Sequence, residues 1–168
     1  GPFMGIKLLS EKVGHSCTDY INTSAPGLTD GESMRTASTL VSKDESVTVP
    51  AGEFSNCALI ETRISTSDEA KADAPAHSFY QGYWAGTRRA WFAPGVGLVR
   101  LRYQHRNGHE TDIQLVEYAH PEPSNDYLPL ALNNRWRYRW VDAQTNVVFE
   151  DALRVAAHGG KEWYIAFV

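Results

Sequence analysis

The fold is decided by residues 96–118, VGLVRLRYQHRNGHETDIQLVEY. Over residues 99–105, apolar or ring-bearing side chains alternate with arginine and glutamine, and this period of two predicts a half-buried strand. A second alternating run covers residues 111–118. The pair Asn107-Gly108 lies between the two runs, which predicts a β-hairpin with a type I′ turn.

The same period recurs along most of the chain, whereas helical periodicity is weak. Residues 65–76 contain alanines but no apolar stripe, and residues 14–32 are rich in Gly, Ser, Thr and Asp, so both are expected to be loops. Further strands are expected at 46–49, 54–64, 77–84, 135–140, 147–156 and 162–168. We therefore expect a mainly β protein of about seven to nine antiparallel strands with little helix, built as a curved sheet or a β-sandwich.

A break at residues 119–126 contains two prolines and little apolar content, and it divides the chain in two. Residues 5–120 are expected to form one β domain. Residues 121–168 are expected to form a three-strand meander that completes the same sheet or begins a second repeat. The first four residues look like a protease-cleavage scar and are left out of the fold prediction.

Composition limits the function classes. The chain has 168 residues and a formal net charge of −4, which argues against a nucleic-acid partner. No apolar run approaches the length of about 20 residues that a membrane-spanning helix needs. Two cysteines, Cys17 and Cys57, are too few for a disulfide framework, and whether they are bonded stays open; Cys57 is expected to be a small buried apolar residue.

Three stretches carry a family resemblance: VTVPAGEFSNC at 47–57, WFAPGVGLVR at 91–100 and YLPLALNNRWRY at 127–138. Together they resemble a signature of poorly characterised bacterial β domains that are often exported or lipid-anchored. The resemblance implies a β fold and a location outside the cytoplasm, in the periplasm, at the cell surface or secreted. It implies no general biochemical activity.

The order of these elements is permuted, because the third stretch normally comes first. A fragment of two tandem repeats, a circular permutation or a sequence cut at an unusual place would each explain it. Residues 126–168 could also pair with a neighbouring molecule, giving an edge-paired or swapped dimer. Among the signature residues, Pro50 is expected at a sheet edge, a bulge or a strand start, and Gly52 in a bulge or turn with positive φ. Pro94-Gly95 is expected to form a type II turn, and Gly97 to allow close backbone approach.

Aromatic side chains form the first candidate site. Trp136, Tyr138 and Trp140 share one face of an expected strand, and Trp84 and Trp91 are candidates to join them. Such residues usually pack in the core. The alternative is a concave aromatic surface that holds an apolar ligand.

Arginines form the second candidate site. Residues 88–140 hold eight arginines against five acids. If the two arginine-bearing strands are neighbours, a positive face for an anionic partner results, formed by Arg100, Arg102, Arg135, Arg137 and Arg139. The alternative is the ordinary polar face of an antiparallel sheet.

No catalytic pattern is present: the chain has no nucleophile elbow, phosphate-binding loop or dinucleotide fingerprint. His105, His109 and Glu110 flank the predicted turn, but they lack a standard metal-ligand spacing. We predict no cofactor, no metal and no catalytic residue. The expected function is a non-enzymatic β module of a bacterial exported or surface protein, with a binding or structural role. The alternatives are a carrier of an apolar ligand, an enzyme with an unrecognised site and a partner-inhibiting protein.

Overall fold

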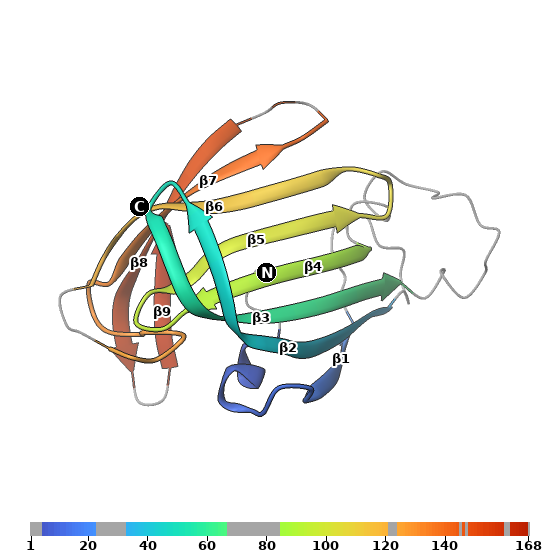
Figure 1. Ribbon diagram of the computed structural model, residues 1–168, viewed down its shortest axis with the longest axis horizontal. Helices are drawn as coiled ribbons and strands as arrows, with labels where there is room; N and C mark the ends of the chain where they lie inside the picture. The colour runs from blue at the N-terminus through green and yellow to red at the C-terminus, as the bar shows by residue number, and fades with distance from the viewer. Residues whose placement is uncertain are drawn as a thin grey trace.

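A computed structural model describes residues 5–22, 33–66, 85–120, 124–144, 146, 148–159 and 162–167 (Figure 1). These residues form a short 3₁₀ helix and one antiparallel sheet in which each strand pairs with the next along the chain. The elements are η1 (Ile6–Ser10), β1 (Ser16–Asn22), β2 (Ser33–Val49), β3 (Gly52–Thr66), β4 (Gly86–Ala93), β5 (Gly97–His105), β6 (Glu110–Ala119), β7 (Arg135–Asp142), β8 (Val148–Gly159) and β9 (Glu162–Phe167). The predicted mainly β, antiparallel fold is confirmed.

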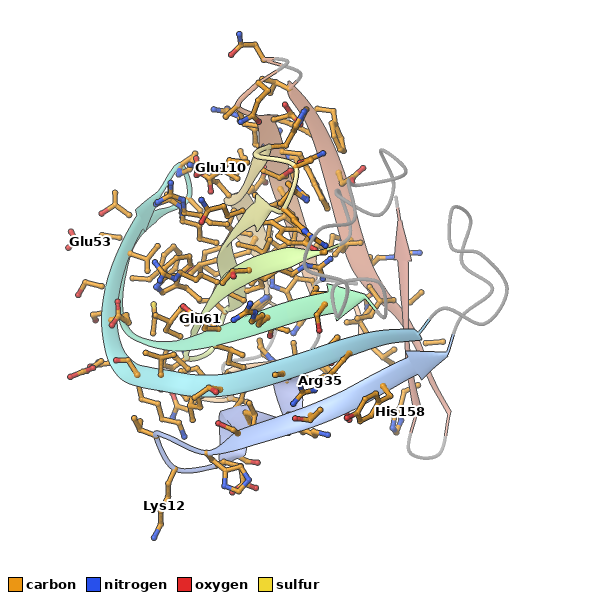
Figure 2. All side chains as sticks on the ribbon, turned by 90° about the vertical axis from the view of Figure 1, so that its right-hand side faces the viewer. Lys12, Arg35, Glu53, Glu61, Glu110 and His158 are labelled. Carbon is orange, nitrogen blue, oxygen red and sulfur yellow. The ribbon has the colours of Figure 1, made fainter. Side chains whose placement is uncertain are left out.

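The architecture is a single curved sheet, and not a sandwich of two. Its order is β1 to β9 in sequence, and the sheet is not closed, because β1 and β9 do not pair. In Figure 2 the strands follow one another around a curved wall. β7 pairs along β6, so the last three strands extend the sheet formed by the first six.

The two faces of the sheet differ sharply. On the face that we call the inner face, strand register aligns an apolar row across six strands: Leu40, Ile60, Ala90, Leu101, Ile113 and Trp140. Leu8 and Leu9 of η1 join the same buried cluster. The opposite face, the outer face, carries the charged residues that alternate with this row.

The long β2–β3 hairpin bends because the register shifts three times between Leu40 and Val47. Figure 1 shows it arching over to β6. At its tip, the backbone N–H of Ala51 donates to the carbonyl of Leu115 at 3.0 Å. The predicted turn at Gly52 is confirmed by its φ of 135°.

The β5–β6 hairpin is confirmed, but its turn type differs from the prediction. A type I′ turn needs positive φ at both central residues. Gly108 has a φ of 88°, whereas Asn107 is not among the residues with positive φ, so the prediction of a type I′ turn is wrong. The amide of Gly108 donates to the carbonyl of His105, and the amide of His105 donates to the carbonyl of His109. This is a type I turn followed by a glycine bulge.

Other local expectations have mixed outcomes. The loop expected over 14–32 is wrong for Ser16–Asn22, which forms β1 because it pairs residue by residue with β2. Pro94-Gly95 forms the expected turn, closed by a hydrogen bond from Val96 to Ala93. The strand expected at 77–84, and most of the loop expected at 65–76, lie outside the described residues.

Both cysteines are free. Cys57 is fully buried in the core, as expected, and burial raises the pKa of its thiol to about 11.

Candidate ligand-binding site on the inner face

A row of polar side chains crosses the inner face next to the apolar row. Register places its members opposite one another from β2 to β6: Ser38, Thr62, Arg88, Tyr103 and Thr111. All five are buried. The row lies toward the end of the sheet where β3 and β5 terminate, on the right in Figure 1. We call these residues, with His105, the inner polar cluster.

Arg88 is the charged member of this cluster. It is only 9% exposed, and its guanidinium lies 4.3 Å from the centroid of the Tyr103 ring. A cation over an aromatic face is an attractive contact, and it holds the guanidinium against β5. An arginine keeps its charge in proteins, so this contact places a fixed positive charge on the inner side of the sheet.

Hydrogen bonds between side chains fix the rest of the cluster. The hydroxyls of Ser38 and Thr62 are 2.8 Å apart. His105 Nε2 lies 2.8 Å from the Thr111 hydroxyl, and the His105 and Tyr103 rings have centroids 4.0 Å apart. Buried hydroxyls and imidazoles both donate and accept, and in this cluster they bond to one another.

The neighbouring row gives the inner face two kinds of surface. Ala90 and Leu101 of the apolar row lie two residues away from Arg88 and Tyr103 on the same strands, and so next to them on the same face. This row continues through Trp140 to Phe149 on β8, where Phe149 is 50% exposed. The inner face therefore combines an apolar row that reaches solvent at one end with a parallel polar row that contains one arginine.

The predicted aromatic surface is not one surface. Trp136 and Tyr138 are buried, and they donate hydrogen bonds to the carbonyls of Val96 at 2.6 Å and Leu98 at 2.9 Å. The space beside them is about 10 Å³, which is too small for anything larger than a water molecule. These two residues anchor β7 across β6, and burial raises the pKa of the Tyr138 hydroxyl.

Of the other three aromatic candidates, the structure describes Trp140 and Trp91. Trp140 is on the inner face and stacks on Phe149 with ring centroids 5.3 Å apart. Trp91 is on the outer face, because it pairs with Arg100 and alternates with the inward Ala90 and Phe92. Trp84 lies outside the described residues.

The arginine candidates share the outer face, but they do not form a positive surface. β6 lies between β5 and β7, so the premise of neighbouring arginine strands is wrong. The acids of β6 and β8 bind these arginines: Arg100 pairs bidentately with Asp112, Arg102 with Glu110, Arg137 with Glu117 and Glu150, and Arg139 with Glu150. Arg135 is exposed and lies opposite Ala119 and Arg154.

His105, His109 and Glu110 diverge in space. His105 points to the inner face and contacts Thr111, whereas Glu110 pairs with Arg102 on the outer face. The His109 ring lies 3.5 Å from the Asp142 carboxylate. Among the described residues no group of three His, Cys, Asp or Glu side chains is placed to hold a metal ion.

Arg88 was missed at the sequence level, although a signal for it exists. Residues 88–92 are RRAWF, and a period of two that places Ala90 and Phe92 in the core also places Arg88 there. Arg89 then points outward, and its side chain is 59% exposed. A charged residue that lies two residues from core positions along a strand is therefore predicted to be buried.

Comparison with known proteins identifies no relative. No family model matches the chain, and neither a curated protein nor a solved structure matches it. The resemblance to exported bacterial β domains therefore stays a prediction. No helix in the described part of the chain is long and apolar enough to cross a membrane.

Proposed function

We propose that the protein is a non-enzymatic binding module whose inner face holds an amphipathic molecule with an anionic head group. The observation that carries the proposal is the placement of Arg88. Its charge lies on the inner face, two residues along β4 from Ala90 of the apolar row. An anionic head would meet Arg88 and the hydroxyls of the inner polar cluster. An apolar tail would lie along the row that ends at Phe149.

Energetics favours this pairing of surfaces. A hydrogen bond to a charged group contributes about 1.5–3 kcal/mol, and each CH₂ taken out of water contributes about 0.8 kcal/mol. A head group without negative charge would forgo the first contribution. The proposal therefore requires selectivity for the sign of the head-group charge as well as for tail length.

The test is a calorimetric titration of the full chain with two amphiphiles of equal tail length and opposite charge. We expect dodecanoate to bind one to one and dodecyltrimethylammonium to bind at least about tenfold more weakly, since about 1.4 kcal/mol corresponds to a factor of ten. Arg88→Met should weaken dodecanoate binding by a similar factor, whereas Arg88→Lys, which keeps the charge, should retain part of it.

The matched control is Arg63→Met. Arg63 is an exposed arginine on β3 that directly follows Thr62 of the inner polar cluster and points to the opposite face. The Arg63→Met variant should bind dodecanoate with unchanged affinity. Equal affinity for the two amphiphiles, or equal affinity of a folded Arg88→Met variant and the unmodified chain, would contradict the proposal.

The cellular setting is part of the same proposal. We propose that the module belongs to an exported or surface protein of a bacterium, on the strength of the resemblance carried by residues 47–57, 91–100 and 127–138. Fractionation of the source cells with an antibody to this chain tests it. Recovery in the cytoplasmic fraction alone would contradict it.

A further inference from the structure

The outer face carries a second feature, a hollow of about 350 Å³ over strands β3 to β6. Its size lies within the range of small-molecule sites. Six side chains line it: Glu61, Thr87, Arg89, Arg102, Gln104 and Glu110. Glu61 on β3 and Glu110 at the start of β6 are labelled in Figure 2. Since Arg89 follows Arg88 along β4 and points the opposite way, the hollow is separate from the inner polar cluster.

The charges in the hollow are ordered across the strands. Arg89 and Arg102 are direct partners in the register of β4 and β5, so two guanidiniums occupy the centre. Glu61 flanks them on one side and accepts a hydrogen bond from Arg89 Nε at 2.9 Å. Glu110 flanks them on the other side and binds Arg102. The order from β3 to β6 is negative, positive, positive, negative.

These contacts use only part of the hydrogen-bonding capacity of the four residues. Arg89 engages Nε and Arg102 engages Nε and Nη2, which leaves both terminal nitrogens of Arg89 and Nη1 of Arg102 without partners in the described part of the chain. Each glutamate likewise binds through a single oxygen. Donors therefore remain at the centre and acceptors at the two sides.

This arrangement selects a chemical class of ligand. Two central guanidiniums favour a carboxylate, because their planar N–H groups match its two oxygens. The flanking carboxylates repel further negative charge and accept hydrogen bonds from hydroxyls. Thr87 and Gln104 add polar groups that both donate and accept. The complement is a small molecule with one carboxylate surrounded by hydroxyls.

We propose that the hollow is a binding site for an acidic sugar unit, a uronate. Its carboxylate lies between Arg89 and Arg102, and its hydroxyls contact Glu61, Glu110, Thr87 and Gln104. The site does not depend on the amphiphile proposed for the inner face.

The experiment is a titration of the full chain with galacturonate, followed by amide NMR. Glucose, which has hydroxyls without charge, and acetate, which has charge without hydroxyls, are the comparison ligands. We expect galacturonate to shift amides of β3 to β6 that surround the hollow and to bind at least about tenfold more tightly than either comparison ligand. Arg89→Gln and Arg102→Gln should each weaken galacturonate binding about tenfold or more.

The matched control is Arg35→Gln, at an exposed arginine of β2 that is labelled in Figure 2 and does not line the hollow. It should leave galacturonate affinity unchanged. Equal binding of glucose or of acetate would overturn the proposal, as would unchanged galacturonate affinity in folded Arg89→Gln and Arg102→Gln variants. Arg88→Met should not affect galacturonate, so failure of this site and failure of the inner-face proposal are distinguishable.

Discussion

At the scale of single residues, His120 connects the turn after β4 to the core. Its Nδ1 donates to the carbonyl of Gly95 at 2.7 Å, and its ring contacts Trp136 edge-on with centroids 5.1 Å apart. Nε2 is buried and has no hydrogen-bond partner within the described ranges. Burial lowers the pKa of His120 from its ordinary value, although the bond to Gly95 opposes this shift. The neutral ring is therefore the form that fits the fold.

This predicts a loss of stability in acid. Because the folded pKa of His120 lies below the unfolded value of 6.5, the unfolded chain binds the proton first. The free energy of unfolding should fall as the pH drops through 6.5 toward the folded pKa. His120→Asn keeps a donor near the position of Nδ1 but does not titrate, so this contribution to the pH dependence should disappear.

Urea unfolding at about pH 8 and about pH 5 measures the effect, since these values lie on either side of an ordinary histidine pKa. An identical pH dependence in the unmodified chain and in His120→Asn would contradict this role.

At the scale of elements, β7 is held by two aromatic anchors. Trp136 and Tyr138 reach across β6 and donate to the carbonyls of Val96, just before β5, and Leu98, within β5. Tyr138→Phe removes one buried hydrogen bond and leaves the Leu98 carbonyl without this donor. We expect the free energy of unfolding to fall by about 1–3 kcal/mol.

Denaturant unfolding of this variant can be compared with that of Tyr118→Phe. Tyr118 is on β6 and 40% exposed, so its substitution should change the free energy of unfolding by less than about 0.5 kcal/mol. Equal stability of the two variants would show that the Tyr138 hydroxyl does not anchor β7.

Local sequence predicted individual strands better than it predicted which strands are neighbours. Alternation in residues 96–118 was sufficient to predict β5 and β6, because hairpin partners are adjacent in sequence. Alternation did not reveal that β6 separates the arginines of β5 from those of β7, since this depends on pairing of β6 with β7 across the break at 119–126. The strand Ser16–Asn22 was missed because its polar residues resemble a loop until β2 is placed beside it.

The candidate sites show the same limit. Arg88 could have been predicted to be buried from its phase with Ala90 and Phe92. Its neighbours Thr62, Tyr103 and Thr111 come from three other strands, and only register brings them into one row. The opposite orientation of Trp91 and Trp136 likewise follows from strand register and burial.

At the scale of the whole molecule, one curved sheet presents two chemically different faces. The outer face is covered by arginine–carboxylate pairs, and exposed pairs of this kind contribute little to stability. The inner face carries the apolar core and, beside it, the inner polar cluster. This contrast supports the binding function that we propose for the inner face, because an apolar row and a polar row lie side by side there.

The most direct measurement is a crystal structure of the full chain with dodecanoate bound. The account predicts the carboxylate within hydrogen-bond distance of the Arg88 guanidinium, about 2.7–2.9 Å for a charged pair, with the alkyl chain against Ala90, Leu101 and Ile113. A dodecanoate molecule found only on the outer face, or an inner face that stays closed at saturating dodecanoate, would contradict it.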